Sequence, residues 1–381
     1  KLDGNYPVGT ANVALGDAAG DAMTTSGSNN VALGTSALTT NTSGTNNVSV
    51  GAASMANNLT GAYNTGVGRH SLASNTTASN NTAVGYQSLY ANTANNNTAL
   101  GHSALFSNTT GSLNAGISQG ALYSNTTGIY NTAAGANAMY LNTTGSSNVG
   151  LGQDALRSNT TASNNTAVGY KAGYANTASY LAAVGYRALT SNTTGAQNTA
   201  MGYEAGVTNT TGGNLSAFGL QAGYSNTTGS SNTFIGANAA RANSTGSYNA
   251  AIGDGSLYSN TTASNNTAVG YQAGYSNTSS GANTFVGHQS GYSNTGSNNS
   301  AFGYGSLRLN TSGVFNVAVG LQSLYSNTTQ SNSTAVGYQA GYSNTSGGVQ
   351  AFGYLALRAN TTGIQNHAFG NQALDANTTG A

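Results

Sequence analysis

The sequence predicts an all-β fold, a parallel β-solenoid of about 22 coils with a seventeen-residue repeat. A pentad of asparagine, two small or compact residues, an apolar residue and glycine occurs 22 times along the 381 residues. Most copies keep the spacing that separates Gly68 from Gly85, a few are one residue closer, and a single pair is one residue further apart. A strand, a crossover helix and two connections need about 30 residues, so the repeat is too short for that unit. It fits one solenoid coil, in which each strand pairs in parallel with its copy in the next coil.

The composition agrees with a repeat fold rather than an ordinary globule. Charged residues are only 4% of the chain, against about 25% in typical soluble domains, so Asn, Thr, Ser and the 54 glycines must cover the surface. A net charge of +1 provides no basic surface for nucleic acid or for an acidic membrane. Cysteine is absent, which excludes disulfides and thiolate metal sites and leaves the redox compartment open. No apolar run approaches the roughly 20 residues of a membrane span.

The repeat predicts one architecture along the chain. Lys1–Thr10 differ slightly from the repeat and are expected to form an N-terminal entry segment, and residues 11–381 a single continuous solenoid. With a rise near 4.8 Å per coil, 22 coils would span roughly 105 Å. The last copy stops within its unit at Asn377–Ala381. Because solenoids usually protect their end strands with polar caps, we expect either a fragment or molecules that stack end to end.

The pentad is predicted to be a short strand followed by a corner. The residue before the glycine is apolar in every copy, and period-2 alternation places it on one face with the compact residue two positions earlier. We assign the core strand to Val84, Leu100, Val168, Val269 and Val336. The glycine permits a sharply turning backbone that other residues avoid. The predicted corner glycines are Gly85, Gly101, Gly169, Gly270 and Gly337.

The segment after the glycine, for example Tyr86–Tyr90, is consistent with either a second strand or a single helical turn. Tyrosines recur in it and would form columns that serve as outer packing or as an adhesive surface. Arginines take the place of the second tyrosine in some copies and are expected to replace it on the surface. The first column contains Tyr86, Tyr170, Tyr186, Tyr203, Tyr271, Tyr304, Tyr338 and Tyr354, the second contains Tyr90, Tyr174, Tyr275 and Tyr342, and the arginines are Arg157, Arg241, Arg308 and Arg358.

A second asparagine follows the glycine at a fixed distance in nearly every copy, as Asn92 follows Gly85. In stacked coils, side-chain amides at one position can hydrogen-bond to those above and below, as in cross-β structures. The polar stretch that follows varies in length, so it is predicted to be a surface turn. The predicted ladder contains Asn75, Asn92, Asn108, Asn125, Asn142, Asn159, Asn176 and Asn192.

The repeat resembles two known groups of fibrous proteins over essentially the whole chain. The pentads Asn12–Gly16 and Asn316–Gly320 resemble the head repeats of trimeric autotransporter adhesins of the YadA type. The longer unit, such as Asn81–Asn92 or Asn165–Asn176, is similar to repeat tracts of phage and bacterial tail-fibre proteins. This resemblance implies a left-handed parallel β-roll in an intertwined homotrimer that serves as an adhesive or spacer shaft, although the unit here is longer than in the adhesin heads.

The resemblance also implies a role for the small residue in the middle of the pentad. If three subunits surround one axis, small side chains would allow their close approach. The residues of this type that we assign to the axis are Gly66, Ala83, Gly116 and Gly150.

The charged and histidine residues do not suggest an active site. A catalytic pair needs two carboxylates about 5 to 10 Å apart, and among the seven acidic residues only Asp17 and Asp21 are expected to come near each other. The four histidines, His70, His102, His288 and His367, have no second type of ligand beside them, whereas zinc needs three or four. We therefore predict no enzyme activity, no metal and no cofactor.

The leading hypothesis is a structural subunit of an extracellular, cell-surface or virion fibre with an adhesive or spacer role. Its partner would be the same protein, in a homotrimer or a head-to-tail polymer. The alternative is ice or glycan recognition by a repetitive face, with cell-surface glycans as partners in the second case. Rows of tyrosine, or the threonines that follow the ladder asparagines, would supply that face; the threonines are Thr93, Thr109, Thr126, Thr143 and Thr160.

Overall fold

The structure is a computed structural model that describes residues 8–380, and it comprises two compact units that divide between Arg187 and Ala188. Most of the expected entry segment, residues 1–7, and Ala381 lie outside the described residues. The described chain contains no helix, and every strand has three residues. The strands of the first unit are β1 (Val13–Leu15), β2 (Val31–Leu33), β3 (Val48–Val50), β4 (Thr65–Val67), β5 (Thr82–Val84), β6 (Thr98–Leu100), β7 (Ala115–Ile117), β8 (Thr132–Ala134), β9 (Val149–Leu151), β10 (Thr166–Val168) and β11 (Ala182–Val184).

The second unit repeats the same architecture. Its strands are β12 (Thr199–Met201), β13 (Ser216–Phe218), β14 (Thr233–Ile235), β15 (Ala250–Ile252), β16 (Thr267–Val269), β17 (Thr284–Val286), β18 (Ser300–Phe302), β19 (Val317–Val319), β20 (Thr334–Val336), β21 (Gln350–Phe352) and β22 (His367–Phe369). The described residues contain no helix that is long and apolar enough to cross a membrane.

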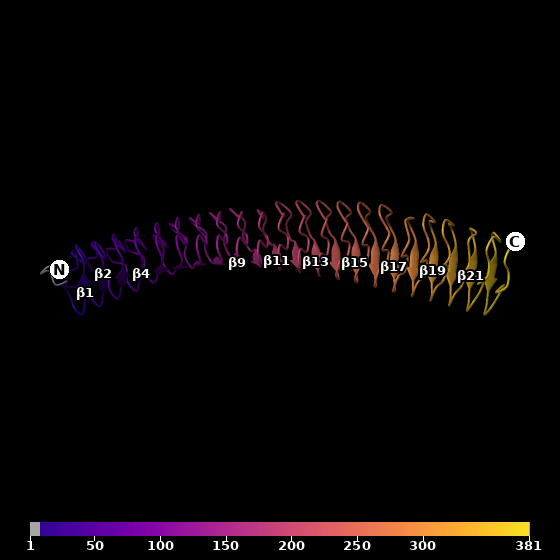
Figure 1. Ribbon diagram of the computed structural model, residues 1–381, viewed down its shortest axis with the longest axis horizontal. Helices are drawn as coiled ribbons and strands as arrows, with labels where there is room; N and C mark the ends of the chain where they lie inside the picture. The colour runs from indigo at the N-terminus through magenta and orange to yellow at the C-terminus, as the bar shows by residue number, and fades with distance from the viewer. Residues whose placement is uncertain (1–7, 381) are drawn as a thin grey trace. The chain divides into compact units, whose positions relative to one another are not determined.

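Consecutive strands within each unit pair in parallel and in register with the repeat, as the ribbon in Figure 1 shows. Thr82 of β5, for example, lies opposite Thr65 of β4 and Thr98 of β6. Each repeat position therefore forms a column that runs from coil to coil. This arrangement confirms the predicted parallel β-solenoid and its repeat length.

The strand faces are the reverse of the prediction. The middle residue of each strand points into the coil, so Ala83 is fully buried, whereas Val84 is 38% and Leu100 is 37% exposed. Val168, Val269 and Val336 are likewise only half-buried. These five residues do end their strands, but their assignment to the core is wrong, because the middle residue of the strand is the one that faces the interior.

The same observation corrects the assignment of small residues to an axis between subunits. Gly66, Ala83, Gly116 and Gly150 are all buried inside their own coils. A Cβ atom on Gly116 would lie 3.3 Å from Cγ of Leu105, and one on Gly150 would lie 3.1 Å from Cγ of Met139. Their small size makes room for side chains of the same chain, not for a second subunit.

The segment after the glycine is neither a second strand nor a helical turn. It alternates between right-handed and left-handed backbone, with φ of 55° at Gln87 and 50° at Leu89. The alternation directs successive amides to opposite neighbours: Gln87 N donates to Arg69 O in the preceding coil and Leu89 N to Ala104 O in the following one, both at 3.0 Å. A left-handed conformation costs about 1 to 2 kcal/mol for a residue with a Cβ. Full burial of Leu89 offsets that cost.

The position of Leu89 in the repeat carries leucine in some coils and glycine in others, such as Gly223 and Gly274. The choice is related to the size of the inward-pointing residue in the neighbouring pentad. Where the pentad carries a large inward residue, glycine makes room for it. A Cβ on Gly223 would lie 2.7 Å from Cδ2 of Phe234, and a Cβ on Gly274 would lie 2.7 Å from Cδ2 of Phe285. Both phenylalanines are fully buried. In these two coils, bulk is thus exchanged between the Leu89 position and the middle residue of the neighbouring strand.

The corner glycines are required for two reasons. Their φ values are 134° at Gly85, 138° at Gly101, 130° at Gly169, 134° at Gly270 and 139° at Gly337, a region that residues with a side chain rarely adopt. The coils also approach closely here, since a Cβ on Gly101 would lie 2.6 Å from Ser118 O. The prediction for these five glycines is confirmed.

Candidate functional surfaces

The predicted amide ladder runs through the interior of both units. Nδ2 of Asn125 donates to Oδ1 of Asn108 at 2.7 Å, and Nδ2 of Asn142 donates to Oδ1 of Asn125 at 2.8 Å. Each Nδ2 also donates to a nearby carbonyl of its own coil, as Asn125 does to Gly128 O at 3.1 Å. Equivalent bonds join Asn75 to Asn58, Asn108 to Asn92, Asn159 to Asn142 and Asn209 to Asn192. All eight predicted ladder residues are fully buried.

Coils that are one residue shorter than the others interrupt this ladder. In them the asparagine turns toward a nearer carbonyl, so Nδ2 of Asn92 donates to Ala94 O at 2.7 Å and Nδ2 of Asn176 to Ala178 O at 2.6 Å. Asn294 and Asn344 make the same substitute bond. Oδ1 of the preceding asparagine then has no hydrogen-bond partner at Asn75, Asn277 and Asn327. In these three places the missing loop residue leaves a buried acceptor unpaired, whereas Oδ1 of Asn159, before Asn176, accepts from Nδ2 of Asn165 at 3.4 Å.

The pentad asparagine forms a second column by a different bond pattern. Oδ1 of Asn114 accepts the backbone N–H of Asn131 at 2.9 Å, and its Nδ2 donates to Gly128 O at 2.8 Å. Since Gly128 O also accepts from Asn125, the two asparagine columns meet at one carbonyl in each such coil. This column joins side chain to backbone, and in some coils an amide-to-amide bond is added, as from Nδ2 of Asn47 to Oδ1 of Asn30 at 3.1 Å. Residue type alone does not reveal this difference from the ladder.

The threonines that follow the ladder asparagines, which would form the ice-binding face, use their hydroxyls as hydrogen-bond donors within the protein. Oγ1 of Thr93 donates to Thr109 O at 3.0 Å, Thr109 to Thr126 O at 3.0 Å, Thr126 to Thr143 O at 3.1 Å and Thr143 to Thr160 O at 3.1 Å. These donors are occupied by the next coil, so the column strengthens the coil-to-coil contact.

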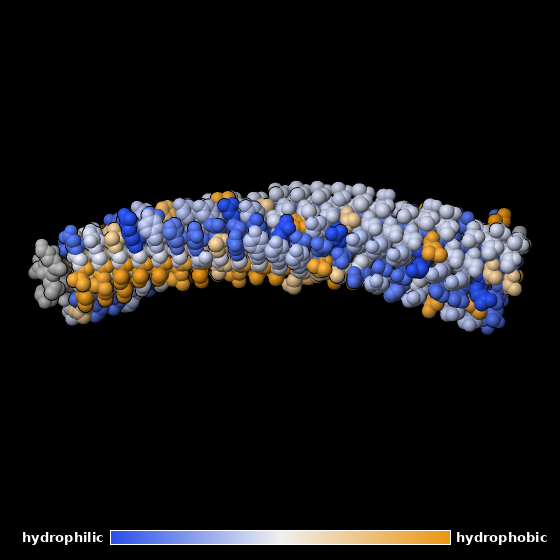
Figure 2. Space-filling model, in the orientation of Figure 1, coloured by the Kyte–Doolittle hydropathy of each residue, from blue (hydrophilic) through white to orange (hydrophobic). Residues whose placement is uncertain are grey.

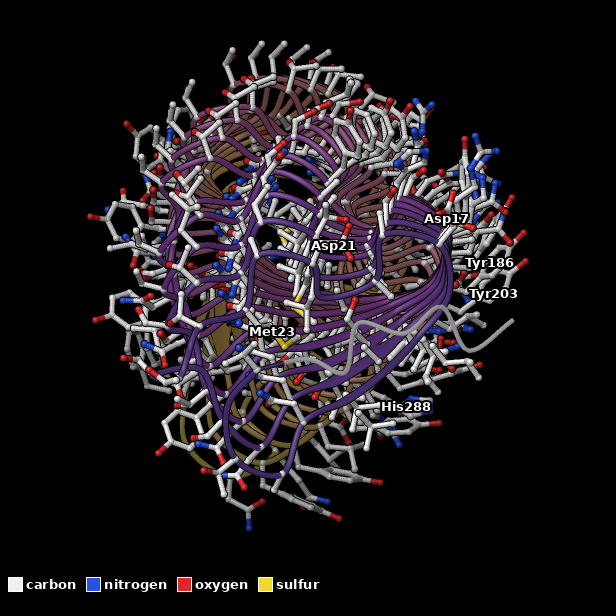
Figure 3. All side chains as sticks on the ribbon, turned by 90° about the vertical axis from the view of Figure 1, so that its left-hand side faces the viewer. Asp17, Asp21, Met23, Tyr186, Tyr203 and His288 are labelled. Atoms are coloured by element: carbon white, nitrogen blue, oxygen red, sulfur yellow. The ribbon has the colours of Figure 1, made fainter. Side chains whose placement is uncertain are left out.

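Two aromatic columns lie on the outside of the coils. In the first, the tyrosines directly after the glycine are 36% to 52% exposed, and Tyr186 and His288 project outward in Figure 3. Histidines also stack in this column, with His102 at 5.3 Å from Tyr86 and His288 at 4.9 Å from Tyr304, measured between ring centroids. Aromatic side chains therefore continue from coil to coil along the surface.

The second aromatic column is half-buried and more closely stacked. Tyr123 and Tyr140 have ring centroids 4.9 Å apart and planes 8° apart, and Tyr258 and Tyr275 have the same values. The arginines replace tyrosine in this column, as predicted, and three of them, Arg157, Arg241 and Arg308, lie between two rings. The guanidinium carbon of Arg157 is 5.4 Å from the Tyr140 centroid and 5.9 Å from that of Tyr174. Arg241 and Arg308 occupy equivalent positions.

An apolar surface covers the outward face of the sheet in each unit. We define the outer sheet face as the first and third residues of every strand. In the first unit it contains only Val, Leu, Ile, Ala and Thr, and Figure 2 shows an apolar band along this unit. Exposure is 54% at Val13, 52% at Leu15, 42% at Ile117 and, in the second unit, 50% at Met201 and 40% at Phe302. Sequence reasoning missed this surface because it assigned the third residue to the core.

The titratable groups of the described residues are dispersed over the coils. Asp154 pairs with Arg157 at 3.4 Å and Asp375 with Arg358 at 3.0 Å. Asp17 and Asp21 are both exposed in the first coil. Within residues 8–380, no group of three His, Asp or Glu side chains converges on a possible metal position. His367 lies exposed at the start of β22.

The fold and its columns define a repeat protein of the β-solenoid class. No family model, no curated protein and no solved structure matches the chain. The argument about function therefore rests on the surfaces described above.

Proposed function

We propose that the protein is a structural subunit of an extracellular or virion fibre, without catalytic activity, and that it assembles with copies of itself through the outer sheet face. The main support is the continuous face on β1–β11, where Val, Leu, Ile, Ala and Thr side chains point outward over consecutive coils. Large exposed apolar patches on soluble proteins mark interaction surfaces.

The size of the outer sheet face is sufficient for a specific interface. Three residues of strand are about 10 Å wide and eleven coils are about 53 Å long, which gives about 500 Å² on one copy. Two such faces in contact would bury about 1,000 Å², about the threshold for a biological protein–protein interface. The face carries no charge in the first unit, so its desolvation costs little.

A second copy of the chain is the partner that suits this face best. Both surfaces would then have the same coil spacing, so side chains of one copy could fit between the rows of the other along the whole face. The resemblance to trimeric adhesin heads favours three copies around one axis, now with the outer sheet face rather than the small pentad residues toward that axis.

The uniformity of the coils supports a passive spacer role. Hydrogen bonds, stacked rings and buried columns repeat with little change, and no coil gathers a distinct set of charged groups in the described residues. A rigid shaft needs this uniformity, whereas an enzyme concentrates unusual residues at one place.

The mass of the protein in solution tests the proposal. The wild type is expected to sediment as an oligomer, and a trimer would have three times the 37.7 kDa of one chain. The double variant Val84→Lys/Ile117→Lys should be monomeric, and Tyr63→Lys, which changes a 63% exposed side chain outside the sheet, should remain oligomeric. A monomeric wild type, or equal behaviour of the two variants with native circular dichroism, would contradict it.

Glycan recognition is the second candidate, favoured by the exposed tyrosines of the first aromatic column. Tyr304 is 50% and Tyr354 is 52% exposed, so their ring edges and hydroxyls are accessible. Stacking with His288 and Tyr338 occupies at least one face of these rings, which limits face-on contacts with sugars. A glycan array compared between the wild type and Tyr304→Ala tests this candidate, and an array without signal would exclude it.

A further inference from the structure

Three tyrosines stack without interruption in the second aromatic column, on coils that follow one another. The ring centroids of Tyr258 and Tyr275 are 4.9 Å apart and those of Tyr275 and Tyr292 are 5.2 Å apart, with planes inclined by 8° and 10°. Because the rings are nearly parallel and occupy equivalent repeat positions, equivalent atoms of neighbouring rings are separated by about the same distance as the centroids. The carbons ortho to the hydroxyl are therefore held close to those of the next ring.

These rings are also accessible to solvent. All three tyrosines are half-buried rather than buried. Burial, together with the neighbouring Tyr258 and Tyr292, raises the pKa of Tyr275 above its ordinary value of 10.0. At neutral pH the ring of Tyr275 is thus a phenol, and its oxidation must release a proton as well as an electron.

Tyrosine is the principal oxidisable side chain on the surface. The sequence contains no cysteine and no tryptophan. Of its four methionines, Met55 and Met139 are fully buried and Met23 is 4% exposed, which leaves Met201 at 50%. An oxidant that reaches the protein therefore meets mainly tyrosine, and the stacked tyrosines are the ones with a reaction partner already in place.

We propose that the column Tyr258–Tyr275–Tyr292 is a site of oxidative cross-linking, in which peroxide and a one-electron oxidant of the haem peroxidase class join neighbouring rings as dityrosine. Each of two phenols gives up one electron and one proton, and the two ortho carbons form a carbon–carbon bond. The hydrogens on these carbons move to the phenol oxygens as the rings regain aromaticity. One peroxide accepts the two electrons and two protons and is reduced to two molecules of water, so the reaction balances.

The product would be a covalent link between consecutive coils. Such a link would add to the amide ladder a bond that denaturants do not break, and it would run along the direction in which the coils separate on unfolding. The inference is independent of the proposed self-association, because the linked residues belong to one chain.

Mass spectrometry after mild oxidation tests this inference. The full chain is treated with hydrogen peroxide and a haem peroxidase at several protein concentrations, and is then cleaved with trypsin. The fragment between Arg241 and Arg308 contains no other Lys or Arg and holds all three tyrosines. The expected result is dityrosine fluorescence together with loss of two hydrogen atoms from this single fragment, at a yield that does not depend on protein concentration.

Two matched variants of the same fragment decide whether stacking is responsible. Tyr275→Phe should abolish the internal link, and the stacking of Phe106 between Tyr90 and Tyr123 shows that phenylalanine is accepted in this column. Tyr248→Phe removes a 67% exposed tyrosine outside the column and should leave the yield unchanged. The inference is overturned if Tyr275→Phe retains the link, if Tyr248→Phe removes it, if links form only between chains, or if no dityrosine forms.

Discussion

Replacement of one ladder asparagine should weaken its coil by an amount that depends on the place of that residue in the ladder. Asn125→Ala removes the bonds to Asn108 Oδ1 and Gly128 O and the bond accepted from Asn142. At about 1 kcal/mol for each bond, plus about 1 kcal/mol or more for the orphaned acceptor of Asn108, the loss is about 4 kcal/mol. Asn75→Ala is the matched control, since Oδ1 of Asn75 already lacks a partner.

The control should cost clearly less. Asn75→Ala removes two bonds, to Asn58 Oδ1 and Ala78 O, and orphans the Asn58 acceptor, but it also removes a buried acceptor that is unpaired in the wild type. We expect a loss of about 2 kcal/mol. Hydrogen exchange of backbone amides in the substituted coil measures local stability in a protein whose repeats need not unfold together. Protection should fall by about three orders of magnitude for Asn125→Ala and by about one and a half for Asn75→Ala; equal losses would refute the reasoning.

Three further predictions concern the core, the corner and alkaline pH. Phe234→Ala should cost about 3 to 5 kcal/mol and Gly223→Leu should also destabilise, yet the double variant should recover a large part of the loss in a thermal-denaturation cycle. Gly85→Ala should lower the melting temperature more than an Ala substitution at an exposed position, such as Thr77→Ala, does, because the φ of Gly85 is 134° and a Cβ there would lie 2.5 Å from a carbonyl oxygen. The raised pKa of Tyr275 means that its contribution to stability is present below pH 10 and is lost as the pH rises through the folded-state pKa. An ultraviolet titration should therefore show one late-ionising phenol that is missing in Tyr275→Phe, and an unchanged curve would contradict this.

The fold class could be predicted from the sequence because each repeat contains positions at which few other residue types would fit. Glycine at Gly85 and its equivalents satisfies both a φ that other residues avoid and a close approach of neighbouring coils. The ladder asparagines are fully buried, so their amides must find hydrogen-bond partners inside the protein, in the coil beside them and among the carbonyls of their own coil. Both requirements recur from coil to coil, so they leave a regular spacing in the sequence.

Alternation alone could not predict which face of each strand points into the coil. Alternation separates Thr82 and Val84 from Ala83 but does not state which side is inside, and hydrophobicity suggested the wrong one. The interior is filled instead by Leu89 from a segment with left-handed residues, which no propensity for strand or helix describes. The small size of the middle residue was the available signal for the interior.

The interruptions of the ladder were also beyond sequence reasoning. The shortened spacing was visible, but its consequence depends on how the Asn92 side chain turns toward Ala94 O. Likewise, the pairing of Gly223 with Phe234 became apparent only when residues of neighbouring coils were seen in contact. Such features arise from packing between positions that belong to different copies of the repeat.

Electron cryomicroscopy of the native assembly, viewed along its long axis, tests the central claim most directly. The account predicts three copies whose outer sheet faces are turned toward a common axis, with Val84, Leu100 and their equivalents excluded from solvent. Single chains, or assemblies in which these faces remain in contact with water, would contradict it.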